Sequence, residues 1–297
     1  MNSKKGLVAG LLAVMGWGSA GLFIKLLPTI SPLWIAAGRS GVAALAIAVL
    51  IIILKKSEAF KNALRLRPIW ELGLYVSAYY LFAVMAYQYA SVAEAALLLS
   101  SSPLFVFGIN LLQKKVPSRK EKVAVSLAVL GTLLIFLPKL LEPSQKEETH
   151  FQGLIYALLS SALIAVFSIR MNRLGSEKHD IFAINFIGFF FLTLPLGFGW
   201  IDESASNEIA QLGTYDALKF LLALGVWSTA IASIFYSIAS IKLTPVIITS
   251  LRFLTPIIAA ILASLILGEN VPWTVWPSGC LILGGLALLT LKKPLFH

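Results

Sequence analysis

The chain has 297 residues, of which 58% are hydrophobic and 13% are charged, and its net charge is +10. Soluble domains usually carry about 25% charged residues, so this composition excludes an ordinary soluble domain and indicates a membrane protein. An apolar helix of about 20 residues crosses the ~30 Å hydrocarbon core of a bilayer. Runs of that kind fill nearly the whole chain.

Ten membrane-spanning helices are predicted in chain order. They cover residues 6–24, 32–54, 72–93, 95–113, 123–138, 151–169, 181–201, 220–241, 246–267 and 271–291. Arg39 interrupts the second run and Arg252 interrupts the ninth. The runs do not alternate between apolar and polar residues, as the strands of a membrane barrel would. The expected fold is therefore an all-α polytopic membrane protein.

Lysine and arginine are distributed unevenly between the two sides of this predicted helix arrangement. With a cytoplasmic N-terminus, most of the 24 basic residues fall on one side, as in segments 55–67 and 114–122. On the other side, residues 202–216 include no lysine or arginine. Short basic loops stay in the cytoplasm, so both termini are predicted to be cytoplasmic, in a prokaryotic inner membrane. The same distribution explains the positive charge without a nucleic acid partner.

A weak internal repeat divides the chain into two halves. At a constant offset in numbering, Ala86 aligns with Ala239, Pro103 with Pro256, and Gly131 with Gly284. We expect one five-helix repeat in residues 1–142, an extracytoplasmic linker in 143–150, and a second five-helix repeat in 151–297. Because five is odd, the second half enters the membrane with inverted orientation. Inverted repeats are common in secondary carriers, which bind substrate near the midplane between the repeats.

Several segments resemble a known family. They are "GWGSAGLFIK" (16–25), "AAGRS" (36–40), "AYQYASVAEAALLLSSSPLF" (86–105) and "YSIASIKLTPVIITSLRFLTPIIAAILASLILGE" (236–269). With these segments the chain resembles an EamA-type transporter of the drug/metabolite transporter superfamily. The first half departs from the pattern, because "LLQKKVPSRK" stands where a second "LGE" is expected. The resemblance implies ten helices, cytoplasmic termini and export of small metabolites, often amino acids.

Arg252 is the leading candidate for contact with a substrate. It follows Pro245 by seven residues, which places it roughly 10 Å into the membrane at the helical rise per residue. An ionisable group at that depth usually faces a cavity or a partner. Arg252 either binds a substrate carboxylate or fixes helix packing. Arg39 lies at a similar depth, and a structural role is favoured for it.

Two glutamates are candidates for gating or coupling. Glu94 lies in the first turn of the fourth predicted helix, where the helix dipole favours an acid, and a proton-coupling role is the alternative. Glu269 ends the ninth helix, where it either caps the following turn or serves as an outer gate. The sequence does not decide between proton coupling and facilitated export.

Aromatic and hydroxyl side chains complete the predicted substrate site. Buried tyrosines and tryptophans need polar partners, and serines and threonines beside a proline kink can satisfy freed backbone groups or line a path. The predicted substrate-binding residues are Trp17, Tyr79, Tyr80, Ser100, Ser101, Trp227, Tyr236, Thr249 and Arg252.

No cofactor and no metal site are predicted. Cys280 is the single cysteine, and the three histidines, His150, His179 and His297, are widely spaced. A polytopic membrane enzyme is therefore a remote alternative, and the chain is predicted not to be an enzyme. Glycines in helices five and ten allow close helix contact, either within the chain or in a homodimer.

The favoured function is export of small amphiphilic metabolites, most plausibly amino acids, by alternating access between the two repeats. The expected partners are a small-molecule substrate and the lipid bilayer. Export of drug-like or cationic metabolites is the alternative. A cation would be better served by a carboxylate and an aromatic cage than by a buried arginine.

Overall fold

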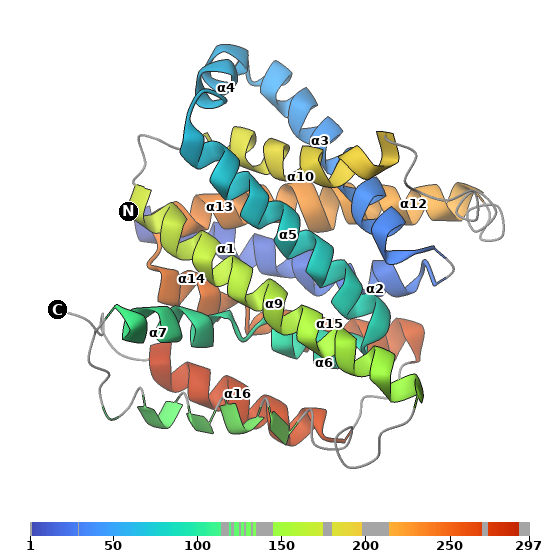
Figure 1. The fold of residues 1–297 in the computed structure, drawn as a ribbon, viewed down its shortest axis with the longest axis vertical. Coiled ribbons are helices and arrows are strands. Elements are labelled where there is room, and N and C mark those ends of the chain that lie inside the picture. The colour runs from blue at the N-terminus through green and yellow to red at the C-terminus, as the bar shows by residue number, and fades with distance from the viewer. Residues whose placement is uncertain are drawn as a thin grey trace.

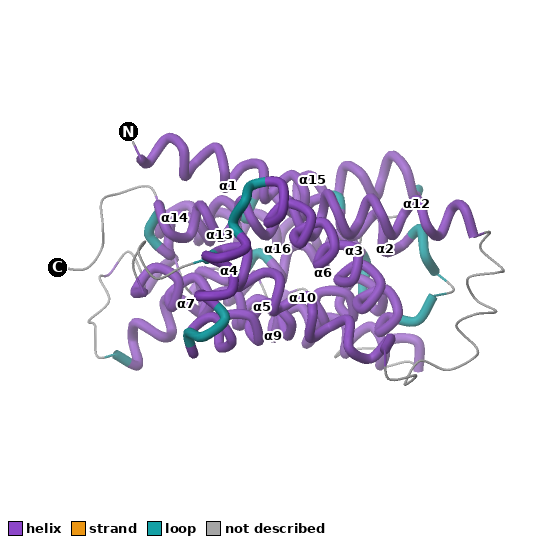
Figure 2. Tube along the Cα trace, turned by 90° about the horizontal axis from the view of Figure 1, so that it is seen from above, coloured by secondary structure: helices purple, strands orange, loops and turns teal. Residues whose placement is uncertain are grey.

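The computed structural model describes residues 2–28, 30–113, 119, 122–124, 126–127, 129–131, 133–134, 145–174, 180–197, 214–268 and 273–290. These residues form helices and short connections, and no strand occurs among them (Figure 2). The helices are α1 (Asn2–Gly18), α2 (Ala20–Lys25), α3 (Pro32–Ile53), α4 (Ser57–Ala63), α5 (Arg67–Tyr89), α6 (Val92–Leu99), α7 (Ser102–Leu112), α9 (Gln145–Leu174), α10 (Ile181–Gly197), α12 (Thr214–Gly225), α13 (Ala232–Lys242), α14 (Pro245–Leu251), α15 (Leu254–Leu262), α16 (Val275–Thr290) and the π-helical segments η2 (Val226–Ile231) and η3 (Ala263–Leu267).

Within the described residues, seven helices are long and apolar enough to cross a membrane. Three shorter apolar helices, Lys122–Gly131, Ile181–Leu194 and Val275–Gly285, lie where the fifth, seventh and tenth spans are predicted. Large apolar side chains also face outward, and Leu45 and Leu265 are 70% and 79% exposed. Long helices that are apolar on their outward faces as well are typical of membrane spans. The all-α polytopic fold is therefore confirmed.

The predicted helix boundaries differ from the structure at the end of the third span. The prediction runs it to Ala93, whereas α5 ends at Tyr89 and Ala90 is extended. Ser91 then begins α6, and its hydroxyl accepts a hydrogen bond from the Glu94 amide. A serine followed three residues later by a glutamate is a capping-box pattern. Hydropathy alone did not locate this boundary, because most of the residues on either side of Ser91 are apolar or aromatic.

Two other elements depart from the sequence expectation. The short helix α4 lies in a segment predicted as a basic loop, and it places Phe60 against α10 through an edge contact with Phe186. Helix α9 begins at Gln145, inside the predicted linker. The division into domains at 142 and 151 stays a prediction.

The longest helices lie side by side in a compact bundle. Figure 1 shows α5 and α9 running alongside each other across one face, with α1 and α13 behind them. Helices α3 and α10 pack against α5 on one side, and α7 and α6 pack against α9 on the other. Helices from the two halves of the sequence are therefore intermixed, and the centre of the bundle is shared by both.

Close backbone approach explains several glycines. At Gly153 on α9, an added Cβ would lie 2.7 Å from the Ala90 nitrogen at the end of α5. At Gly131, it would lie 2.8 Å from the Ser278 carbonyl oxygen on α16, so the fifth and tenth predicted helices touch within the chain. At Gly279 and Gly284, it would meet nothing within 4 Å among the described residues. The predicted homodimer remains a prediction.

We expect Gly153→Ala to destabilise the protein and Gly38→Ala to leave it equally or more stable. The new methyl at position 153 meets backbone, which forces α9 away from α5 at a cost of about 1–3 kcal/mol. At position 38, it would lie 3.5 Å from the Leu221 side chain, an ordinary contact, and alanine is the better helix former. Thermal unfolding in detergent measures both, and a Gly153→Ala midpoint at or above that of Gly38→Ala would contradict the packing.

Candidate substrate site between the two halves

Two broken helices meet at the centre of the bundle. The fourth span breaks between α6 and α7 at Ser100 and Ser101, and the ninth breaks between α14 and α15 at Arg252 and Phe253. The Ser100 hydroxyl donates to the Arg252 carbonyl oxygen at 2.9 Å, which joins the two breaks directly. Broken helices at corresponding positions of the two halves are the best sequence-readable pointer to a carrier's binding site.

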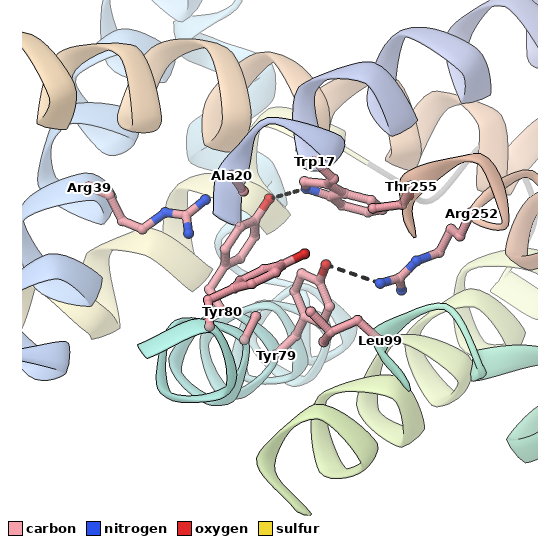
Figure 3. A pocket seen from close by; sticks show the side chains of 10 residues that line it. Trp17, Ala20, Arg39, Tyr79, Tyr80, Leu99, Arg252 and Thr255 are labelled. Atoms are coloured by element: carbon pink, nitrogen blue, oxygen red, sulfur yellow. Dashed lines mark hydrogen bonds between the residues drawn. The ribbon is translucent and has the colours of Figure 1, made fainter. Parts of the chain in front are cut away.

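An aromatic layer lies beside this junction. The Trp17 Nε1 donates to the Tyr80 hydroxyl at 2.8 Å, and the Tyr80 hydroxyl also bonds to Ser233 Oγ at 2.6 Å. The Trp17 ring packs on Tyr79 and Tyr236, with centroid distances of 5.6 and 4.7 Å. Figure 3 shows Trp17, Tyr79 and Tyr80 between the two arginines Arg39 and Arg252. Helices α1, α5 and α13 supply these four aromatic rings.

Arg252 is buried among these rings with most of its hydrogen-bonding capacity unused. Its side chain is 1% exposed, and its Cζ lies 4.9 Å from the Trp17 ring centroid and 5.3 Å from that of Tyr79. Its Nη2 donates to the Tyr79 hydroxyl at 3.3 Å, as Figure 3 shows. Its Nε and Nη1 have no hydrogen-bond partner among the described residues. Buried donors of this kind are rare and call for a functional explanation.

Arg39 is equally buried but its contacts are structural. Its Nε donates to Thr229 Oγ1 at 2.8 Å and its Nη2 donates to the Ser228 carbonyl oxygen at 3.3 Å. Its Cζ lies 4.9 Å from the Tyr80 ring centroid. Both hydrogen-bond partners belong to η2, where the π-helical turn displaces the normal helical bonds. These contacts support the structural role favoured from sequence.

A small cavity separates the two arginines. It is lined by Trp17, Ala20, Arg39, Tyr79, Tyr80, Ala83, Tyr87, Leu99, Arg252 and Thr255. Its volume is about 10 Å³, which is room for about one water molecule. A metabolite enters only if the walls separate. The structure therefore shows the site in a closed arrangement.

The predicted site residues divide into two groups. Trp17, Tyr79, Tyr80 and Arg252 line the cavity, and Tyr236 packs on Trp17 while its hydroxyl bonds to Ser168 Oγ at 2.8 Å. The hydroxyls of Ser101 and Thr249 donate to helix carbonyls three and four residues earlier and so satisfy local backbone. The single Ser100 hydroxyl hydrogen is shared between the Ala96 carbonyl oxygen on its own helix and the Arg252 carbonyl oxygen. Trp227 does not line the cavity, and it is 36% exposed on η2.

Two residues that line the cavity, Thr255 and Tyr87, are not among the substrate-binding residues predicted from sequence. Thr255 is 2% exposed and its hydroxyl has no hydrogen-bond partner among the described residues. It follows Arg252 by three residues. In the helix predicted for the ninth span, this spacing places the two side chains on one face, so the sequence could have predicted that Thr255 lines the cavity. Tyr87 is also buried and lies over Gly21, where an added Cβ would meet its ring at 2.8 Å. Gly21 therefore makes room for the Tyr87 ring.

Glu94 lies apart from the cavity and stabilises the start of α6. It is fully buried, and its Oε2 accepts from the Ser91 hydroxyl at 2.6 Å. His150 Nε2 lies 2.7 Å from the same oxygen and links α6 to α9. These contacts support a capping role at the helix start. Glu269, the other predicted gating residue, lies outside the described residues.

We expect Glu94→Gln to keep substrate counterflow within about twofold of wild type. It should lower stability by about 1 kcal/mol, because it weakens the hydrogen bonds that the carboxylate makes with Ser91 and His150. Counterflow and thermal unfolding of the same preparation measure the two effects. If the variant loses uptake driven by a pH gradient while counterflow persists, Glu94 is a coupling carboxylate instead.

A second, larger cavity lies between α6, α15, η3 and α16. Its volume is about 620 Å³, and its described walls are apolar apart from Ser264 and Cys280. None of its described lining residues is charged. Without a group that fixes orientation, this cavity offers no specific recognition of a polar metabolite. The candidate site is therefore the cavity between the arginines.

An all-helical polytopic fold with a buried polar cavity between broken helices is an architecture that membrane carriers use. The family model of the EamA-like transporter family matches residues 4–137 and 151–291. The chain therefore belongs to this family, within the drug/metabolite transporter superfamily. The two matched segments fall on either side of the start of α9.

Individual relatives agree with this assignment. A protein of Clostridium kluyveri named "Uncharacterized transporter" is 25% identical over 63% of this chain and 59% of its own length. One of Archaeoglobus fulgidus with the same name is 24% identical over 69% of each chain. The chain thus matches about three fifths of the Clostridium relative. A solved structure titled "Crystal structure of protein" has a TM-score of 0.66 at 17% identity and covers 97% of this chain and 98% of its own, so the fold is shared.

Proposed function

We propose that this protein is a secondary transporter that exports small amphiphilic carboxylates, the class that includes the amino acids expected from sequence. One observation carries the proposal: the buried Arg252 guanidinium keeps two nitrogens unpaired at the wall of an aromatic cavity. A guanidinium is the group best suited to hold a carboxylate, because its planar donors match both oxygens. The surrounding rings would hold an apolar substrate body.

The geometry also supports alternating access. The cavity is closed. The fourth and ninth spans, which contribute Leu99 and Arg252 to its wall, are both broken next to these residues. Movement of one half against the other would separate Leu99 from Arg252. These two residues occupy equivalent positions in the two repeats, at the same offset in numbering as Ala86 and Ala239. Such rocking around a fixed central site is the usual motion of inverted-repeat carriers. Cytoplasmic termini remain expected on the basis of the basic loops, and a prokaryotic inner membrane remains the expected location.

Counterflow in proteoliposomes tests the proposal. Vesicles containing the purified protein would be loaded with unlabelled leucine, phenylalanine or their 2-hydroxy analogues, and entry of the labelled compound would be followed. We expect saturable exchange of at least one of these carboxylates. Exchange limited to a lipophilic cation such as tetraphenylphosphonium would overturn the proposal and favour the drug-exporter alternative. Protein-free vesicles provide the background.

A further inference from the structure

The closed cavity has an uneven charge distribution that bears on substrate class. Two of its lining residues, Arg39 and Arg252, carry a positive charge, and none of its described lining residues is an aspartate or glutamate. Glu94 is the buried acid among the described residues, and its carboxylate is engaged by Ser91 and His150 at the start of α6. The described walls therefore offer an anion two cations and offer a cation no counter-charge.

The aromatic faces do not supply the missing counter-charge. A ring face can hold an ammonium group through a cation–π contact. Here the Arg252 guanidinium already lies over Trp17 and Tyr79, and the Arg39 guanidinium lies over Tyr80. Three of the four aromatic rings that line the cavity are thus occupied by the protein's own cations. An ammonium group entering the site would meet two like charges over the same rings.

Hydrogen-bonding capacity points the same way. An ammonium group needs three acceptors, whereas a hydroxyl group needs one acceptor and can accept in return. The Thr255 hydroxyl is buried, lines the cavity and has no partner among the described residues. The Tyr80 hydroxyl is already bonded to Trp17 and Ser233. The Thr255 hydroxyl therefore matches a substrate hydroxyl, whereas an ammonium group would find hydroxyl oxygens but no carboxylate among the described lining residues.

We propose that this site selects carboxylates whose second carbon bears an uncharged group, such as 2-hydroxy acids with an apolar side chain, over the amino acids with the same side chain. The carboxylate would bind Arg252, the 2-hydroxyl would bond to Thr255, and the side chain would lie against Tyr87 and Leu99. This inference rests on the proposed function and narrows its substrate class.

The test compares molecules that differ only in the group on the second carbon. Counterflow of L-3-phenyllactate is measured against L-phenylalanine, and L-2-hydroxyisocaproate against L-leucine, at neutral pH with protein-free vesicles subtracted. Like charges placed together repel each other, so we expect the hydroxy acid of each pair to reach half-saturation at a concentration at least about tenfold lower. Phenethylamine, which has the ammonium group and no carboxylate, is expected to give no exchange.

Each result has one meaning. Half-saturation of the amino acid at a concentration equal to or below that of its hydroxy analogue overturns the inference while leaving carboxylate transport intact. Exchange of phenethylamine also overturns it. Failure of all four carboxylates to exchange, in protein shown to be folded, overturns the proposed function itself. Thr255→Val provides a matched variant: it removes the hydroxyl but keeps the shape, and it should raise half-saturation for the hydroxy acid more than for the amino acid.

Discussion

Replacing Arg252 by glutamine is expected to reduce carboxylate counterflow at least about 30-fold without lowering thermal stability. The guanidinium would make charge-assisted hydrogen bonds to the substrate, and such bonds contribute about 2 kcal/mol each. Two of its nitrogens have no partner among the described residues in the closed site. The desolvation cost that this incompletely bonded charge carries offsets the contacts with Trp17 and Tyr79 that the substitution removes. Arg39, whose guanidinium is bonded to Thr229 and to the Ser228 carbonyl oxygen, carries no such uncompensated cost.

Arg252→Lys provides the matched control for charge. Lysine keeps the positive charge but loses the planar fork of donors, and the two are not interchangeable at a site that binds a carboxylate with two bonds. We expect Arg252→Lys to transport at a rate between those of wild type and Arg252→Gln. Counterflow and the unfolding midpoint are measured on the same preparation. Wild-type counterflow in Arg252→Gln would make the arginine structural and would remove the observation on which the proposed function rests.

The sequence predicted the ten spans because hydropathy over about 20 residues is set by the thickness of the bilayer. It also placed Arg252 inside the ninth membrane span, because a single charged residue within a long apolar run is easily recognised. It could not predict that Arg252 is partly unpaired, since this depends on Tyr79 from α5 and Trp17 from α1 meeting it in space. Partners that lie more than 170 residues away leave no local signal.

The sequence also could not predict which face of each membrane helix points toward the cavity. Trp17 and Trp227 both lie within predicted spans, yet Trp17 lines the cavity and Trp227 is 36% exposed. A helix that is apolar on all sides gives no periodic signal to separate its inner face from its lipid face. The π-helical turn η2 adds a further shift, because it rotates the residues after Val226 relative to a regular helix. A place for Thr255 at the cavity could be predicted only from its spacing of three residues after Arg252.

Arg39→Gln is the same substitution at the other buried arginine. We expect it to lower thermal stability while leaving the affinity for carboxylates nearly unchanged, the reverse of Arg252→Gln. The Arg39 guanidinium bonds to Thr229 and to the Ser228 carbonyl oxygen and lies over Tyr80. Removing it leaves a buried carbonyl with one donor fewer, which costs about 1–3 kcal/mol, and removes a desolvated cation–π contact of about 2 kcal/mol. We expect a loss of about 3–5 kcal/mol, the sum of these two, visible as a lower unfolding midpoint in detergent.

Transport by Arg39→Gln distinguishes an arginine that holds η2 in place from one that contacts the substrate. If Arg39 holds η2 in place and does not contact substrate, molecules that remain folded should keep half-saturation for carboxylates within about threefold of wild type, because the direct charged contact comes from Arg252. A variant that unfolds like wild type but loses affinity as Arg252→Gln does would place both arginines on the substrate. The site would then bind two anionic groups, because a single carboxylate held by Arg252 does not need a second guanidinium.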